Sequence, residues 1–246
     1  MSISRVAALY DIHGNLPALE AVLQEVRDAG VDRIVVGGDV LPGPMPRECL
    51  THLLDLDLPI QFIQGNGDRE VIAPTGAVPD AYRESMRWNA AQLSPAEIQI
   101  LASWPLTCRT TIDALGDVLF CHATPRNDTE IFTRQTPDGP LLTIFGALGV
   151  PLAVCGHTHM QFDRTIGTVR VVNAGSVGMP FGEPGAYWLL LGPDVQLRRT
   201  SYDLERAAER IRATAYPKAE EFAASNVLQP PGEADILAMF AQAEVT

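Results

Sequence analysis

The stretch Leu9-Tyr10-Asp11-Ile12-His13-Gly14-Asn15 comes after a short apolar run near the start of the chain. The run from Arg5 to Tyr10 is rich in β-prone residues and predicts a strand. An acid and an imidazole, one residue apart, therefore stand where that strand should end. Asp, Gly and Asn are ordinary turn residues, so this stretch alone predicts only a polar loop. Its meaning depends on the residues at the ends of the other strands.

Segments typical of strands and helices alternate along the chain, which indicates an α/β fold. Asn15 can cap a helix that Gly30 ends, and Ser94 opens a capping box. Further strands are expected at Arg33–Val36, Ile60–Ile63, Asp117–Cys121, Leu152–Cys155, Thr168–Val172 and near Ala186–Leu191. Further helices are expected around Arg47–Leu56, within 80–104, at Leu204–Ala215 and near Ala234–Ala243, with a polar loop over 123–140. No Pro/Gly/Ser linker divides the chain, so we expect one domain over 1–246 whose C-terminal helices occupy about 204–243.

Polar clusters come directly after five of the expected strands. They are Asp11-Ile12-His13, Gly37-Gly38-Asp39, Gly65-Asn66-Gly67-Asp68, His122, and Gly156-His157-Thr158-His159. In open α/β sheets, ligands bind outside the carboxyl ends of the strands, so these clusters can meet in one cleft. Each cluster alone is more often a turn or a loop. Their joint occurrence at successive strand ends favours a functional site.

The residue types in these clusters are typical of a transition-metal site. In extended backbone, alternate side chains share a face, which predicts that Asp11 and His13 point the same way, as do His157 and His159. Glycines beside them allow close approach of the backbone. Carboxylate, imidazole and amide ligands suit Mn, Fe, Zn, Ni or Co. The remaining histidine, His52, is expected on the polar side of its helix.

Composition and charge narrow the function further. The net charge is −12 and Lys218 is the single lysine, which disfavours binding to long nucleic acids because such binding depends on Lys and Arg contacts to phosphates. The start of the chain lacks the pattern of a secretion signal, and no apolar stretch reaches the ~20 residues that a membrane span needs. A cytoplasmic protein with no membrane partner is therefore expected. Its cysteines are expected to be reduced and mostly buried, with a metal role for Cys121 or Cys155 as the weaker alternative.

The order of the clusters resembles the signature of the calcineurin-like metallophosphoesterase superfamily, which reads DxH, GD, GN, H and GHxH. The segment Asn173-Ala174-Gly175-Ser176-Val177-Gly178 also resembles a turn of its small bacterial and archaeal phosphodiesterase branch. The resemblance implies a four-layer α-β-β-α sandwich of two packed mixed β-sheets flanked by helices. It also implies two divalent transition-metal ions per chain, with manganese favoured.

The resemblance further assigns the ligands position by position. One metal ion would be held by Asp11, His13 and His159. The second would be held by Asn66, His122 and His157, and Asp39 would bridge the two. Catalysis would rest on Asp39, Asn66 and His122 together with a hydroxide between the metal ions, which attacks a small phosphate ester.

The sequence departs from the fuller family pattern at one position. Many members have a histidine after GN that can protonate the leaving group, and Gly67 stands there in this chain. This favours a phosphodiesterase, and a histidine introduced at position 67 is expected to help poor leaving groups. Arg126 and Arg69 are the candidate residues for binding the substrate phosphate, with a surface ion pair as the alternative for each.

Two other functions remain open at this point. A phosphomonoesterase acting on proteins or nucleotides could use the same metal centre. A non-catalytic scaffold of the same fold is the third possibility, and it is disfavoured because all seven ligand positions are retained. The physiological substrate, the metal and the oligomeric state stay open.

Overall fold

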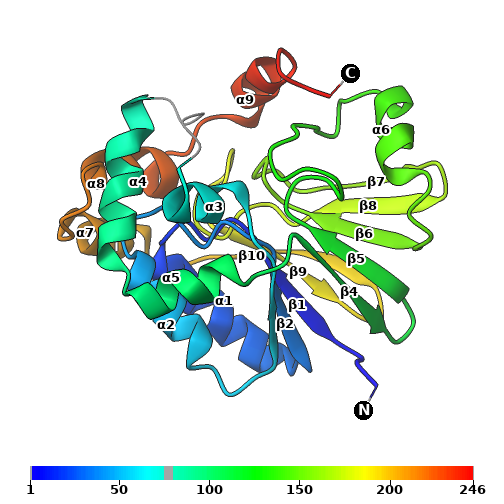
Figure 1. The fold of residues 1–246 in the computed structure, drawn as a ribbon, viewed down its shortest axis with the longest axis horizontal. Coiled ribbons are helices and arrows are strands. Elements are labelled where there is room, and N and C mark those ends of the chain that lie inside the picture. Colours follow the sequence, from blue (N-terminus) through cyan, green and yellow to red (C-terminus); the bar gives the residue numbers. More distant parts are fainter. Residues whose placement is uncertain (1, 75–79, 246) are drawn as a thin grey trace.

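Two five-stranded mixed sheets form the centre of the computed structural model, which describes residues 2–74 and 80–245 (Figure 1). The first sheet has the order β10 (Val195–Thr200), β9 (Ala186–Leu191), β1 (Val6–Leu9), β2 (Arg33–Val36) and β3 (Ile60–Phe62). The second has the order β4 (Thr107–Ile112), β5 (Gly116–Cys121), β6 (Leu152–Cys155), β8 (Val169–Asn173) and β7 (Phe162–Ile166). Strands β1, β2 and β3 pair in parallel, as do β5, β6 and β8, and the other strands pair antiparallel.

Alternating residues of the strands separate the two sides of each sheet. Val6, Ala8 and Tyr10 face the second sheet, whereas Ala7 and Leu9 pack against helices. The outer helices of the first sheet are α1 (Leu16–Ala29), α2 (Pro46–Leu54), α3 (Asn66–Ile72), α4 (Asp80–Gln92) and α5 (Pro95–Ala102). Helix α6 (Asp138–Phe145) covers the outer face of the second sheet. The expected four-layer α-β-β-α sandwich is therefore confirmed.

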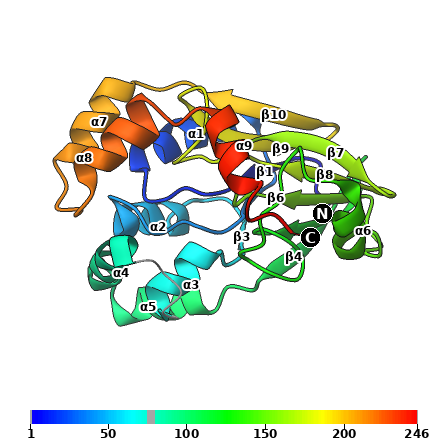
Figure 2. The ribbon, with the colours of Figure 1, turned by 90° about the horizontal axis from the view of Figure 1, so that it is seen from above.

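The C-terminal segment adds a further helical group. It contains α7 (Leu204–Arg212), α8 (Ala219–Phe222), the π-helix η1 (Ala223–Leu228) and α9 (Glu233–Phe240). Buried side chains of α7, α8 and η1 form a separate apolar cluster that also includes Met45, next to the first residue of α2. Figures 1 and 2 show α4, α7 and α8 on one side of the molecule and α6 on the other.

The local signals of the sequence account for several element boundaries. Asn15 caps α1 by accepting a hydrogen bond from the Ala18 N–H, and Gly30 ends it in the left-handed conformation. Ser94 and Glu97 form the expected capping box of α5. The sequence does not predict the edge strands β4, β7 and β10, because their residues are mostly polar or half-exposed. Helix α3 begins at Asn66, inside a cluster whose residues predict a loop.

Tyr10 fixes the two sheets relative to each other directly beside the first polar cluster. Its ring is fully buried between the sheets, and its hydroxyl donates a hydrogen bond of 3.1 Å to the Val154 carbonyl of the second sheet. A buried hydroxyl needs such a partner. The carboxyl ends of β1 and β6 are thereby held together at the edge where the clusters lie.

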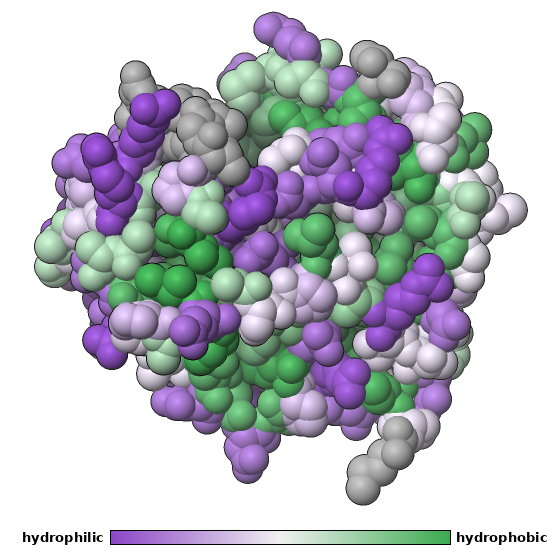
Figure 3. Space-filling model, viewed as in Figure 1, coloured by the Kyte–Doolittle hydropathy of each residue, from purple (hydrophilic) through white to green (hydrophobic). Residues whose placement is uncertain are grey.

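Surface hydropathy and helix length bear on whether residues 2–74 and 80–245 could contact a membrane. On the face seen in Figure 1, hydrophobic residues lie in small groups between hydrophilic ones (Figure 3). No helix of that part of the chain has both the length and the apolar character needed to cross a bilayer.

Candidate metal centre

The five polar clusters meet at one edge of the two sheets. Asp11 and His13 come after β1, Asp39 after β2, and Asn66 after β3, whereas His122 comes after β5. His157 and His159 come after β6, and the His157 N–H donates to Asp11 Oδ2 at 2.9 Å, which joins the two sheets again. The structure thus brings all seven sequence-predicted ligands together.

Most of the candidate ligands project from residues with left-handed backbone conformation and not from extended backbone. Among the described residues, six that are not glycine have positive φ, and five of them are Asp11, His13, Asp39, His157 and His159. The expectation of extended backbone at the two D/H-x-H motifs is therefore wrong. Each such residue costs about 1–2 kcal/mol of backbone strain. Strain gathered in this way is typical of functional sites.

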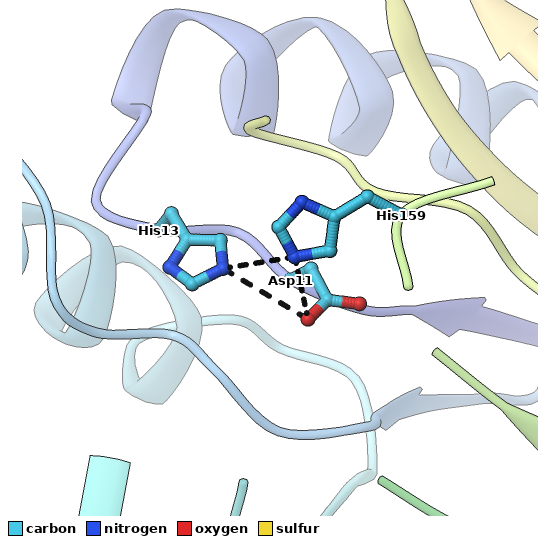
Figure 4. Close-up of side chains that lie close together, drawn as sticks. All are labelled: Asp11, His13 and His159. Carbon is cyan, nitrogen blue, oxygen red and sulfur yellow. Dashed lines mark hydrogen bonds and ion pairs between the residues drawn. The ribbon is translucent and has the colours of Figure 1, made fainter. Parts of the chain in front are cut away.

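The first group of candidate ligands is Asp11, His13 and His159 (Figure 4). Asp11 Oδ1 lies 3.2 Å from His159 Nε2 and 3.9 Å from His13 Nε2. The two Nε2 atoms lie 3.2 Å apart. Asp11 Oδ1 is fully buried and has no hydrogen-bond partner among the described residues. A buried carboxylate oxygen without a donor is rare, and this one is suited to bind a cation.

Backbone carbonyls orient three of the imidazoles. Nδ1 of His13, His122 and His159 lies 3.2, 3.0 and 2.7 Å from the carbonyl oxygens of Pro42, Gly37 and Met179. Because a carbonyl can only accept, Nδ1 carries the proton and Nε2 presents its lone pair to the centre. This is how proteins fix the tautomer of metal-binding histidines.

The second group contains Asp39, Asn66, His122 and His157. His122 Nε2 lies 3.5 Å from Asp39 Oδ2 and 3.1 Å from Asn66 Oδ1. The Asn66 Oδ1 position is also 3.0 Å from His157 Nδ1 and 3.1 Å from the Asp128 carbonyl, and only a rotated amide could donate to these three acceptors. A cation among them would instead hold the oxygen in place. The donor set thus fits divalent transition metals with mixed nitrogen and oxygen ligands.

The ionisable groups of the cluster shift one another's pKa values. Burial opposes ionisation of Asp11 and Asp39, but the imidazoles of His159 and His122 outweigh it and hold the pKa of each carboxyl below its usual range. Burial lowers the pKa of His122, but the Asp39 and Asp11 carboxylates raise it to about 10. Burial and the charge of His122 lower the pKa of His157 to about 4. The carboxylate of Asp39 and the imidazole of His122 therefore stabilise each other's charged forms.

A family comparison agrees with this geometry. Residues 5–192 match the model of the calcineurin-like phosphoesterase superfamily domain. The chain belongs to the calcineurin-like phosphoesterase superfamily. Membership indicates a hydrolase that acts on phosphate esters with the help of divalent metal ions. Two sets of side chains lie close enough together to hold such ions, Asp11 with His13 and His159, and Asp11 with Asp39 and His122.

Proteins from bacteria and archaea resemble this chain over most of its length. The chain is 27% identical to an uncharacterized protein of Methanocaldococcus jannaschii in an alignment of 239 positions, which covers 87% of this chain and 95% of the relative. A metallophosphoesterase from Sphaerobacter thermophilus is 28% identical, with a TM-score of 0.71 over 92% of this chain and 100% of its own. A hypothetical protein from Pyrococcus horikoshii has a TM-score of 0.77 at 20% identity, over 93% of this chain and 99% of its own.

Asp68 holds two ligand loops of this phosphoesterase in position, a role that the sequence does not define. Its Oδ2 accepts the Asp39 N–H at 2.8 Å and the Gly65 N–H at 3.1 Å, and its Oδ1 accepts the Leu41 N–H at 3.0 Å. Burial and the Asp39 carboxylate raise the pKa of Asp68 to about 7, against the effect of these donors. The only signal in the sequence is its place in Gly65-Asn66-Gly67-Asp68.

The two arginines expected near the substrate are both paired with acids in this phosphoesterase. Arg69 forms a two-point ion pair with Asp128, at 2.7 and 3.1 Å, and contacts Glu70. Arg126 contacts Glu130 at 2.7 Å, and 54% of its side chain is exposed. It lies on the loop after His122, beside a cavity of about 20 Å³ that the His122 ring also borders. Their role in substrate binding stays a prediction.

Gly67 is tightly enclosed, which explains the missing histidine. A Cβ at this position would lie 2.5 Å from the Leu41 carbonyl oxygen, and the Gly67 N–H donates to Asp39 Oδ1 at 2.7 Å. No side chain fits here unless the 41–42 backbone moves. A histidine introduced at position 67 would therefore require the 41–42 backbone to shift, and its effect on poor leaving groups stays a prediction.

The cysteines take no part in the ligand groups. Cys121 and Cys155 are buried among apolar residues on the outer side of the second sheet, and burial raises the pKa of both thiols. Neither belongs to a candidate metal group among the described residues. The sequence-based expectation of reduced, buried cysteines holds for both.

We predict that metal affinity rises with pH. His122 keeps its proton below a pKa of about 10 in the metal-free protein, so a metal ion must displace that proton at neutral pH. Each proton released makes the affinity rise by about tenfold per pH unit. Titration with Mn²⁺ between pH 6 and 9 measures this slope. A His52→Gln variant, changed outside the centre, should keep it, and an affinity independent of pH would contradict the charge state given above.

We also predict that Asp68 supports both stability and metal retention. Asp68→Ala leaves three buried N–H groups without an acceptor, at about 1–3 kcal/mol each, so the free energy of unfolding should fall by at least about 3 kcal/mol. Metal affinity should fall by ~10–100-fold. Asp68→Asn keeps one acceptor oxygen and should give intermediate values in denaturant unfolding and metal titration. Unchanged values in Asp68→Ala would show that the loops hold without this carboxylate.

Proposed function

We propose that this chain is a phosphodiesterase that holds two divalent transition-metal ions, manganese being favoured, and hydrolyses small phosphate esters in the cytoplasm. The observation that carries the proposal is the position of Asp39 Oδ2. It lies 3.8 Å from His13 Nε2 of the first group and 3.5 Å from His122 Nε2 of the second. Because Oδ1 is bound to the Gly67 N–H, Oδ2 is the oxygen free to bridge two metal ions.

Each ligand residue has a defined part in this proposal. Asp11, His13 and His159 would hold one ion, Asn66, His122 and His157 the other, and Asp39 both. Two bound ions would polarise the phosphate ester and acidify a water molecule. The protein contributes fixed imidazole tautomers, a strained backbone that cannot relax away from the centre, and the two carboxylates.

The charges near the centre support a diester substrate over a monoester. A monoester carries up to two negative charges, and a diester carries one. Arg69 and Arg126, the cations nearest to the ligands in sequence, are already neutralised by Asp128, Glu70 and Glu130. The net charge of −12 adds to the repulsion of highly charged substrates. The absence of a side chain at Gly67 favours esters whose leaving group departs without a proton from that position.

The direct test compares bis-p-nitrophenyl phosphate with p-nitrophenyl phosphate, in metal-free and Mn²⁺-loaded protein. We expect metal-dependent hydrolysis, higher kcat/KM for the diester, and two metal ions per chain. Asp39→Asn should reduce the content of both ions and lower kcat by more than ~100-fold. This loss exceeds that expected from changing a residue that only hydrogen-bonds to a metal ligand. Asp163→Asn, which changes a surface ion pair on β7, is the matched control.

The remaining outcomes separate the alternatives. A higher kcat/KM for the monoester would indicate a phosphomonoesterase and overturn the proposal. Metal-free protein that binds no ions and cleaves neither ester would indicate the non-catalytic scaffold. One fully active ion per chain would contradict the bridging role of Asp39.

Arg126 is expected to bind the substrate phosphate in competition with Glu130. Arg126→Ala should then raise KM for the diester by about tenfold, the effect of one lost charged hydrogen bond, without changing metal content. Glu130→Gln should lower KM, because it frees the guanidinium. Arg170→Ala removes a surface arginine from β8 and serves as control. A KM unchanged in both site variants would leave Arg126 as a surface ion pair only.

A further inference from the structure

A cavity of about 210 Å³ opens directly beside the candidate metal centre. His13, Asp39, Asn66 and Gly67 form the part of its wall that adjoins the ligands. An organic group bound in this cavity is therefore close enough to be part of the same molecule as a phosphate held at the metal centre. A volume of about 210 Å³ is enough to accommodate one ring system beside the metal centre.

The rest of the wall comes from two segments that are far apart in the sequence. Helix α4 contributes Tyr82 and Met86, and the C-terminal segment contributes Tyr216 and Phe222. The Tyr216 ring is fixed edge-on by Trp88, with ring centroids 5.3 Å apart, and by Phe222 at 6.3 Å. Aromatic surfaces held in this way need no reorganisation to stack on a flat ligand.

The polar groups of the cavity are few and nearly neutral in sum. Lys218 pairs with Glu221 at 3.1 Å, and its ammonium lies 4.9 Å from the centre of the Tyr82 ring. The Asn226 amide adds both a donor and an acceptor. Since Lys218 is already neutralised, the cavity favours an uncharged group with a polar edge over a second phosphate.

The wall lies partly outside the domain that defines the superfamily. The family match ends at residue 192, whereas Tyr216, Lys218 and Phe222 come after it. The metal ligands all lie before that boundary. The residues that would contact the organic part of the substrate thus lie partly in a different segment of the chain from the metal ligands.

We infer that this cavity binds the nucleobase of a small nucleoside phosphoester whose phosphate lies at the metal centre. The inference rests on the proposed phosphoesterase function and names its substrate class. Tyr82 and Tyr216 supply stacking surfaces, Met86 adapts to the ring shape, and Asn226 and the Lys218–Glu221 pair face the polar edge. A nucleobase is planar, uncharged and polar at its edge. It therefore suits the aromatic rings, the paired charges and the amide of the cavity wall.

The test measures inhibition of bis-p-nitrophenyl phosphate hydrolysis by adenosine 5′-monophosphate and by ribose 5-phosphate. Both inhibitors carry the same phosphate, and only the first carries a base. We expect the nucleotide to bind at least about tenfold more tightly, the scale of one stacked base. Tyr216→Leu and Tyr82→Leu should bring the two inhibition constants close together, and Tyr216→Phe should keep them apart because it keeps the ring.

Controls distinguish a lost pocket from a damaged protein. Tyr82 is 52% exposed, so Tyr82→Leu should fold even if Tyr216→Leu does not. Tyr187→Leu, on β9, should leave the ratio of inhibition constants unchanged. Inhibition by ribose 5-phosphate and Mn²⁺ content should be normal in every folded variant.

The outcomes bear on the two proposals separately. Equal inhibition of the wild-type protein by both compounds would overturn the nucleobase pocket and leave the phosphoesterase function standing. Inhibition by phenyl phosphate as strong as by the nucleotide would also overturn it, because the polar edge of the base would then contribute nothing. Absence of any ester hydrolysis would instead refute the proposed function, whatever the compounds bind.

Discussion

The structure brings together acceptor atoms of Asp11, His13 and His159 at a buried position. Asp11 Oδ1 has no hydrogen-bond partner among the described residues, and the Nε2 atoms of His13 and His159 lie 3.9 and 3.2 Å from it. In the absence of a cation these groups repel one another or take up protons. Interactions elsewhere in the fold must therefore keep these groups in place against their mutual repulsion.

Several independent restraints keep these groups in place. The Tyr10 hydroxyl joins the two sheets next to the centre, and the Asp68 carboxylate gathers the N–H groups of the loops after β2 and β3. Backbone carbonyls hold three of the imidazoles by their Nδ1 atoms. The left-handed residues store strain that these hydrogen bonds and the packed core offset. A bound cation would remove the repulsion, so metal binding and folding stability are coupled here.

Sequence patterns could predict the positions of the ligands but not the way the backbone aims them. The apolar strands before Asp11, Asp39 and His157 are evident in the sequence, and the rule that ligands gather at carboxyl ends of strands places the site. The motif at Asp11 and His13 predicts extended backbone, and the structure has φ of 53° and 46° there. Asp and His adopt that conformation more often than most residues with a side chain, but still in a small minority of cases, so the motif alone does not predict it.

Other features had no signal because they are contacts between distant parts of the chain. The carbonyl of Met179 is the partner of His159, and any residue can supply a carbonyl. The edge strands β4 and β10 contain few buried apolar residues, because one side of an edge strand is exposed to solvent. The aromatic cavity joins α4 to the C-terminal helices, and neither segment alone carries a motif.

The close packing around Gly67 links this local detail to the choice of substrate. The Leu41 carbonyl fills the space where a side chain at position 67 would begin, and the Gly67 N–H orients the Asp39 carboxylate. The loop that leaves Asp39 Oδ2 free therefore leaves no room for a side chain at position 67 unless the 41–42 backbone moves. The cavity beside Gly67 is bounded instead by Tyr216 and other residues beyond the family-defining domain. Changes in that segment can alter which organic group is accepted while the ligand loops, which tolerate so little change, stay as they are.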